Sequence, residues 1–163
     1  MRYDLLLTHT NNAARQTTRR KIMFHTSPNK IEEGMINKLG IADDCLFFSD
    51  RVYQMSDASV YVYKADFDCI SASELHDDEI IAEIAERFSC DEDFAEGLLD
   101  GSENEWSLDG VDGYDSWWLQ GKRGECAVKM GYDGCEDEDE QGTVYIVPMF
   151  GRESELKLID VCK

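Results

Sequence analysis

The order of hydrophobic patterns along the chain predicts an α+β domain. Short apolar runs rich in β-branched and aromatic residues, which are typical of strands, occupy residues 22–25, 45–48 and 59–67. Apolar residues at helical spacing follow between residues 80 and 130, and strand-like runs return at 143–147 and 156–161. Because strands come first, helices second and strands again last, the two kinds of element are segregated, as in α+β folds.

The early strands are bounded by turn residues. The run Ile22-Met23-Phe24-His25 is followed by Thr26-Ser27-Pro28-Asn29, which favours a turn. A short helix is predicted over residues 30–39, ended by Gly40. Residues 59–67, Ser-Val-Tyr-Val-Tyr-Lys-Ala-Asp-Phe, have the strongest strand composition in the chain.

Three helices are predicted in the middle of the chain. Asp77 and Asp78 precede the first, and acidic residues stabilise a helix N-terminus. The spacing of Ser89 and Glu92 is that of a capping box for the second helix, which Gly101 would end. The third would begin at Asp115 or Ser116 and run to Met130, with Trp117, Gly121, Gly124 and Val128 on one stripe.

The charge is strongly negative and unevenly distributed. The 163 residues carry a net charge of −19, yet residues 1–30 carry +5 and the remainder −24. We therefore expect a basic, flexible arm over residues 1–20 and a single domain over residues 21–163. A surface this negative repels phosphate backbones, so direct nucleic-acid binding is not expected. No apolar run is long enough to span a membrane, and the cysteine and histidine spacing favours no metal site.

Three groups of residues could carry chemistry. His25 ends the first predicted strand and is followed by Thr26. Ser49 and Asp50 end the second. The run Glu136-Asp137-Glu138-Asp139-Glu140 enters the strand at 143–147. Five adjacent carboxylates repel one another, so at least one is expected to turn inward, where a carboxylate beside a cleft is a catalytic candidate.

These segments, in this order, resemble a known enzyme family. The strings Phe24-His25-Thr26-Ser27, Leu46-Phe47-Phe48-Ser49-Asp50, 127–134 (Ala-Val-Lys-Met-Gly-Tyr-Asp-Gly) and 142–147 (Gly-Thr-Val-Tyr-Ile-Val) are similar to small phage ADP-ribosyltransferase-like domains. More narrowly, residues 119–124 through 138–143 resemble phage anti-CRISPR enzymes that ADP-ribosylate the type I-F CRISPR surveillance complex. The resemblance covers about residues 22–148 and implies two antiparallel sheets, splayed around an NAD cleft, with a few flanking helices.

The resemblance also implies roles for individual residues. His25 corresponds to a histidine that hydrogen-bonds an NAD ribose, with Thr26 beside it. Ser49 and Phe48 correspond to a strand edge that lines the nicotinamide pocket. The tyrosine that packs on the nicotinamide ring is assigned to Tyr53, with Tyr61 and Tyr63 as alternatives. The catalytic acid, which would hold the ribose 2′-hydroxyl, is assigned to Asp139, with Glu138 and Glu140 as alternatives.

The function implied is mono-ADP-ribosylation with NAD as co-substrate and without a metal. The acceptor would be a side chain, asparagine being one candidate, on the large subunit that recognises the protospacer-adjacent motif (PAM) in the type I-F complex. Such a protein would act in the host bacterial cytoplasm, without membrane or direct nucleic-acid contacts. Two alternatives stay open: a stoichiometric acidic mimic of DNA, which the −24 balance over residues 31–163 favours, and an NAD-hydrolysing toxin on the same fold.

Overall fold

The computed structural model describes residues 20–36, 44–52 and 60–162, and its elements follow the predicted α+β order. Three strands come first, three α-helices follow, and three strands close the chain. The strands are β1 Arg20–Ser27, β2 Cys45–Ser49, β3 Val60–Ser71, β4 Gly134–Asp139, β5 Gly142–Pro148 and β6 Lys157–Cys162, and the helices are α2 Asp78–Phe88, α3 Glu92–Asp100 and α4 Gly113–Lys129. Three single-turn 3₁₀ helices, η1 Ala72–Glu74, η2 Glu105–Ser107 and η3 Glu153–Glu155, complete the described elements.

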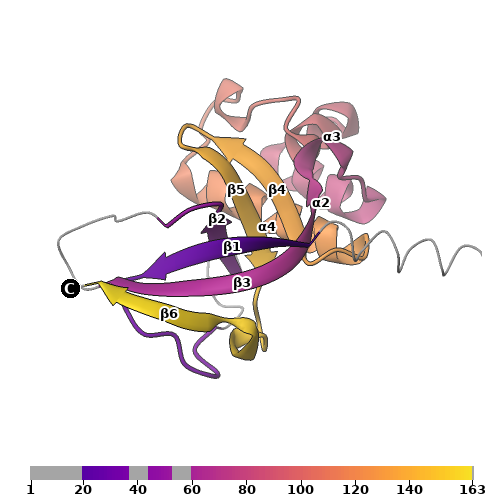
Figure 1. Ribbon diagram of the computed structural model, residues 1–163. Coiled ribbons are helices and arrows are strands. Elements are labelled where there is room, and N and C mark those ends of the chain that lie inside the picture. Colours follow the sequence, from indigo (N-terminus) through magenta and orange to yellow (C-terminus); the bar gives the residue numbers. More distant parts are fainter. Residues whose placement is uncertain (1–19, 37–43, 53–59, 163) are drawn as a thin grey trace, which may run out of the picture.

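The six strands form one sheet that divides into two antiparallel halves, the first built on the long strand β3 and the second on β5 (Figure 1). In the first half, β3 pairs with β1 along one edge and with β6 along the other. In the second half, β5 lies between β2 and β4. The halves are joined by a parallel pairing of β3 with β4, and by a single residue pair between Phe24 of β1 and Ser49 of β2.

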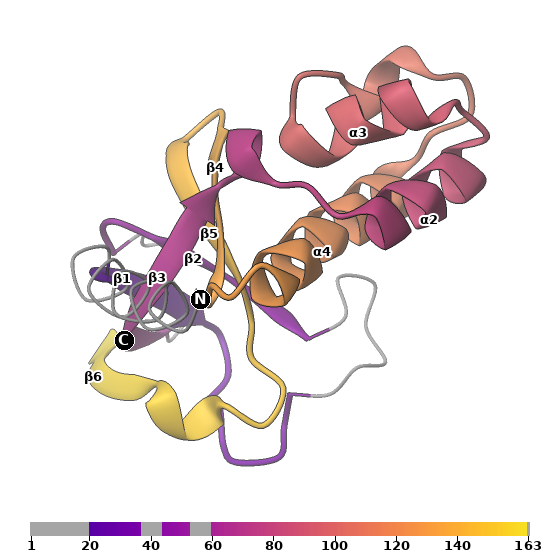
Figure 2. The same ribbon diagram turned by 90° about the vertical axis from the view of Figure 1, so that its right-hand side faces the viewer.

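The helices lie together on one side of the second half of the sheet (Figure 2). Helix α4 lies against β4 and β5, while α2 and α3 pack farther out. Their apolar faces form one core with residues such as Ile84, Leu98 and Leu119, and with Ile146 of β5. A second core, which includes Met23, Phe48, Phe67 and Tyr145, fills the space on the other side of β2 and β5. The second core contains residues of both sheet halves, so it packs the two halves against each other.

The three predicted helices exist, and Asp77 caps α2 and Gly101 ends α3 as predicted, but the N-caps of α3 and α4 differ from the predicted ones. The N-cap of α3 is Asp91, and Ser89 instead ends α2 in a left-handed conformation at φ 51°. The N-cap of α4 is Asp112, with Asp115 as its capping-box partner, so neither Asp115 nor Ser116 is the cap. An earlier aspartate suffices because its carboxylate reaches the N–H groups of the first turn.

The stripe predicted on α4 is only partly correct. Gly124 does pack closely, since a Cβ atom there would lie 2.9 Å from Cys45 Sγ. Trp117 and Val128, however, are exposed, and Leu119 and Ala127 are among the residues that face the core. The contact with β5 and β2 thus includes Gly121 and Gly124 of the predicted stripe but not Trp117 and Val128.

The helix predicted over residues 30–39 is wrong as far as residue 36, and residues 37–40 lie outside the described residues. Gly34 adopts a left-handed φ of +81°, which ends a turn instead of continuing a helix. The backbone N–H groups of this segment bind side chains far along the chain: Ile31 donates to the Tyr63 hydroxyl and Ile36 to the Glu153 carboxylate. Tertiary hydrogen bonds therefore replace helical ones here.

The acidic run is mostly a strand. Residues 136–139 belong to β4, and only Glu140 and Gln141 form the turn that leads into β5. The charge is tolerated because cations from other elements approach it: Arg123 of α4 pairs with Asp137, and Lys21 of β1 with Glu136. Strand β1 begins at Arg20, and residues 1–19, which make up nearly all of the predicted arm, lie outside the described residues. Among the described helices, none is sufficiently long and apolar to cross a membrane.

Candidate active site

A cavity of about 260 Å³ opens where β1 diverges from β2, next to the β4–β5 hairpin. Five of the predicted site residues line it: His25, Thr26, Phe48, Ser49 and Asp139. The other described lining residues are Phe24, Phe47, Gln141, Thr143 and Val144. The fold thus brings residues of β1 and β2 together with the β4–β5 hairpin, which lies about 90 residues later in the sequence.

The predicted tyrosine cannot be placed in the same way. Tyr53 lies outside the described residues. Its alternatives, Tyr61 and Tyr63, are in β3 and are not among the described residues that line the cavity. Tyr63 is buried, and its hydroxyl accepts a hydrogen bond from the backbone N–H of Ile31 at 2.6 Å. Through this hydrogen bond, Tyr63 fixes the segment that follows β1.

His25 is held in one orientation and one tautomer. Its Nδ1 atom lies 2.7 Å from the carbonyl oxygen of Phe47. A carbonyl oxygen only accepts hydrogen bonds, so Nδ1 carries the proton and Nε2 of the neutral ring is an acceptor. Burial lowers the pKa of His25, while the Phe47 hydrogen bond opposes that shift. At neutral pH the ring therefore presents an acceptor nitrogen.

Phe48 and Ser49 contribute differently to the cavity. The Phe48 side chain is almost fully buried, and its ring packs against the His25 ring at 5.6 Å between centroids and against Phe67 at the same distance. Phe48 therefore supports the histidine from the core side. Ser49 is half-buried, and its hydroxyl donates to the Arg51 carbonyl at 2.6 Å, which leaves its oxygen lone pairs as acceptors.

Asp139 is the one acidic residue among the described lining residues of this cavity. It is the last residue of β4, and its Oδ1 atom accepts a hydrogen bond from the Gln141 backbone N–H at 2.7 Å, which orients the carboxylate. Its alternatives Glu138 and Glu140 line only the neighbouring cavity described next. The carboxylates that turn farthest inward are those of Glu136 and Asp137, whereas Asp139 is exposed at the rim.

A second cavity, of about 510 Å³, lies on the other side of Asp139. It shares Phe47, Asp139 and Val144 with the first, and the segment between α3 and α4 forms its outer wall. Arg123 of α4 forms part of its floor, where the guanidinium donates to the Leu98 and Leu99 carbonyls and to Asp137. This buried arginine ties the C-terminal end of α3 to the strand that carries Asp139.

Sequence reasoning missed several lining residues. Phe24, Phe47 and Val144 give the cavity apolar walls, while Gln141 and Thr143 add polar groups from the hairpin. Thr143 and Val144 belong to a strand that the sequence predicts. Their position just after the acidic run could have identified them as lining residues. The role of the Phe47 carbonyl had no such signal, because a backbone acceptor leaves no mark on the sequence.

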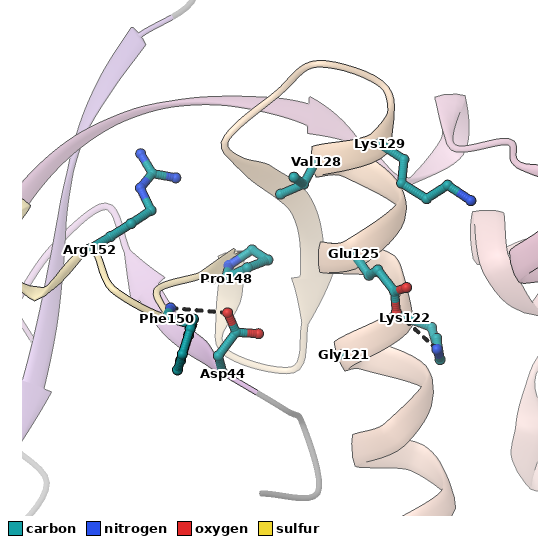
Figure 3. A pocket seen from close by; sticks show the side chains of 9 residues that line it. All are labelled: Asp44, Gly121, Lys122, Glu125, Val128, Lys129, Pro148, Phe150 and Arg152. Carbon is teal, nitrogen blue, oxygen red and sulfur yellow. Dashed lines mark hydrogen bonds and ion pairs between the residues drawn. The ribbon is translucent and has the colours of Figure 1, made fainter. Parts of the chain in front are cut away.

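Another cavity, of about 420 Å³, lies between α4 and the chain that follows β5 (Figure 3). None of the predicted site residues lines it. Its cations are engaged: Lys122 pairs with Glu83 and Glu125, Lys129 with Asp77 and Glu79, and Arg152 with Asp133 and Glu155. In Figure 3 the Lys122 and Lys129 side chains extend away from Arg152, on the far side of α4. This cavity is therefore a weaker candidate for an anion site.

Cysteine chemistry is also a poor candidate near the site. Cys126 and Cys135 are buried between α4 and the sheet. Burial raises the pKa of the Cys126 thiol to about 11 and that of Cys135 to about 12. Both are therefore protonated at neutral pH, and a thiol is a weak nucleophile compared with a thiolate.

Comparison with solved structures gives a likeness of fold. The chain is similar to a crystal structure described as that of an anti-CRISPR protein, with a TM-score of 0.53 and 23% sequence identity. The alignment covers 81% of this chain and 92% of that one. No protein-family model and no curated protein sequence matches the chain. At this identity, the two chains share an α+β architecture over most of their lengths.

Proposed function

We propose that the protein is an NAD-dependent mono-ADP-ribosyltransferase. The observation that carries this proposal is the convergence of His25, Thr26, Ser49 and Asp139 on one cavity. An acceptor nitrogen, hydroxyl groups and a carboxylate around a partly apolar space suit a ribose beside a flat aromatic amide. The fold likeness to an anti-CRISPR protein is consistent with the same proposal.

The chemistry is a substitution at the ribose carbon C1′ that bears nicotinamide. The bond from C1′ to the ring nitrogen breaks, and nicotinamide leaves as a neutral molecule with the bonding electron pair. Positive charge then develops on the ribose, as in glycoside hydrolysis. Asp139 would accept a hydrogen bond from the 2′-hydroxyl and oppose that charge, while Nε2 of His25 would accept one from a ribose hydroxyl.

Transfer requires an acceptor nucleophile in place of water. A side-chain nitrogen or oxygen of the acceptor protein forms the new bond to C1′ and releases its proton to solvent, so charge and atoms balance. Water that reached C1′ first would give hydrolysis, the reaction of a toxin. The apolar walls from Phe24, Phe47 and Val144 favour exclusion of water.

As acceptor we propose the PAM-recognising large subunit of the type I-F CRISPR surveillance complex, on the basis of the sequence resemblance. The added ADP-ribose carries two phosphates, which would obstruct DNA at a DNA-binding surface by size and by like charge. The protein would then be made by a phage or mobile element and would act in the cytoplasm of the host bacterium.

A second candidate is a stoichiometric mimic of DNA, favoured by the net charge of −19. A mimic would occupy a basic DNA channel directly and would need no NAD. Its inhibition would reach completion only at equimolar protein, and it would weaken as salt screens the charges. These properties separate the two candidates in one titration.

The test is incubation of the purified protein with labelled NAD and the type I-F complex, followed by mass spectrometry of each subunit. We expect one ADP-ribose addition per complex at substoichiometric protein. Asp139→Asn keeps the Oδ1 acceptor for Gln141 and should lower the rate about 10²- to 10³-fold. The matched variants Glu138→Gln and Glu140→Gln should still release nicotinamide from NAD at about the wild-type rate.

Each outcome decides between specific alternatives. If Asp139→Asn kept full activity and Glu138→Gln or Glu140→Gln lost it, the catalytic acid would be Glu138 or Glu140 instead of Asp139. NAD-independent inhibition at a one-to-one ratio would replace the enzyme with the mimic. Nicotinamide release without any protein adduct would identify a hydrolase.

A further inference from the structure

The larger cavity beside Asp139 has an exposed aromatic wall. Trp106 of η2 lines this cavity, and 56% of its surface is accessible. The segment that carries it is fixed in place, because Asn104 caps the Trp106 backbone N–H at 2.9 Å and Glu105 accepts a hydrogen bond from Ser116 of α4 at 2.7 Å. An indole held at the surface by a rigid backbone is a typical anchor for a protein partner.

The cavity is also strongly acidic. Arg123 is its single cation within the described part of the chain, and Asp137 with two backbone carbonyls occupies that guanidinium. The acidic lining residues are Glu103, Glu105, Asp137, Glu138, Asp139 and Glu140. A dinucleotide carries a pyrophosphate, which this lining repels, so the larger cavity is a poor place for NAD.

Aromatic rings in this protein already receive cations. Arg87 lies over the Trp118 ring at 4.6 Å, and Lys122 lies at 5.3 Å from the same ring. For Trp106, the described residues supply no such cation. An exposed indole among carboxylates therefore offers a site for a lysine or arginine from outside the chain.

We propose that the larger cavity docks a lysine- or arginine-rich segment of the acceptor protein, while NAD occupies the cavity of His25. This inference rests on the proposed function and assigns the acceptor side of the same site. The two cavities share Phe47, Asp139 and Val144, so an acceptor side chain docked beside Trp106 lies next to the carboxylate that holds the ribose. The negative charge of the domain then selects a cationic partner.

The proposal is tested with a fluorescein-labelled twelve-residue peptide of Lys, Arg, Gly and Asn, and with a counterpart in which Glu replaces the cations. Fluorescence polarisation at low salt should detect only the cationic peptide. Trp106→Ala and Glu103→Gln should each raise its dissociation constant about three- to thirtyfold. The matched controls are Phe150→Ala, an exposed aromatic residue at the cavity of Figure 3, and Glu86→Gln on the exposed face of α2.

A second measurement separates docking from chemistry. Release of nicotinamide from NAD and binding of ADP-ribose should be the same in Trp106→Ala as in wild type, while transfer to the peptide or to an acceptor protein falls. The docking site is overturned if the control variants lower the affinity for the cationic peptide as much as Trp106→Ala does. It is also overturned if Trp106→Ala leaves that affinity unchanged. Loss of ADP-ribose binding in Trp106→Ala also overturns it, because the cavity would then hold the nucleotide. If wild type releases no nicotinamide, the proposed function fails, and the peptide affinities still decide the docking site.

Discussion

His25 of β1 donates a hydrogen bond from Nδ1 to the carbonyl oxygen of Phe47 in β2, across 2.7 Å. The two strands share only the Phe24–Ser49 residue pair, so this side-chain contact is part of what joins them. It also determines which ring nitrogen carries the proton, and so leaves Nε2 as the acceptor. One hydrogen bond thus has both a structural and a chemical role, and the two roles can be separated by substitution.

The first prediction uses that separation. In His25→Asn the amide nitrogen takes the place of Nδ1 and can still donate to Phe47, but the acceptor at Nε2 is lost. In His25→Gln the amide oxygen reaches the Nε2 position, while the donor to Phe47 is lost. We expect His25→Asn to keep its stability within about 1 kcal/mol and to lose nicotinamide release about tenfold or more, with His25→Gln less stable but more active. Urea unfolding measures the stability, and an assay of nicotinamide release measures the activity. If His25→Asn were fully active, Nε2 of His25 would have no role in the reaction.

The second prediction concerns pH. Burial lowers the pKa of His25 in the folded protein below 6.5, the value expected in the unfolded chain. Between these two values the unfolded state binds more protons, so the free energy of unfolding falls as pH drops through 6.5 and levels off below the folded pKa. Imidazole resonances followed by NMR should give a midpoint below 6.5, and the His25-dependent loss of stability should be absent in His25→Asn. A midpoint at or above 6.5 would contradict the buried, neutral ring.

The third prediction concerns the strand that carries Asp139. A Cβ atom at Gly134 would lie 2.3 Å from the backbone oxygen of Ile146, so β4 and β5 must separate in Gly134→Ala. We expect a loss of about 1–3 kcal/mol and reduced activity, because the shift is transmitted along β4 toward the hairpin. Gly113→Ala, at the first residue of α4 with open space around it, should be neutral or slightly stabilising. Urea denaturation compares the two, and equal stabilities would show that β4 adjusts freely.

The fourth prediction concerns Arg123. Arg123→Met keeps much of the side-chain volume but leaves the Leu98 and Leu99 carbonyls and Asp137 without their donor. Breaking a largely buried set of charged hydrogen bonds should cost about 2–4 kcal/mol. Arg123→Lys keeps the positive charge but cannot make all three directed contacts, so its stability should lie between those of Arg123→Met and the wild type. The midpoint of urea unfolding checks this order, and a stable Arg123→Met would mean that packing alone holds α3 to β4.

Local signals predicted much of the fold. The pattern of residues 59–67 predicted β3, and Asp77 correctly preceded α2, because strand composition and capping act over a few residues. The helix predicted over residues 30–39 failed within the described residues because the Tyr63 hydroxyl and the Glu153 carboxylate, both distant in sequence, bind its backbone. The acidic strand was likewise hidden, since Arg123 and Lys21 reach Asp137 and Glu136 only once the sheet exists.

The candidate site likewise combines features that the local sequence predicted with features that only tertiary packing creates. His25 and Ser49 were predicted at strand ends, Asp139 was assigned within the acidic run by the resemblance, and the described cavity contains all three. The stack of Phe48 on His25, the Phe47 carbonyl and the cavity of Trp106 depend on how two sheet halves meet. Such features arise from tertiary packing, so no local pattern encodes them.

The pairing of β3 with three partners has a consequence for synthesis of the protein on the ribosome. The β1–β3 pair can form once residue 71 has emerged, but the other edge of β3 must wait for β4 and β6. Strand β2 likewise cannot pair along its full length until β5 has been synthesised. Contacts between such distant segments form late, because long loops must close first. Almost the whole chain must therefore be translated before His25 and Asp139 can face the same cavity, and a truncated product would present open strand edges to aggregation instead of a partial site.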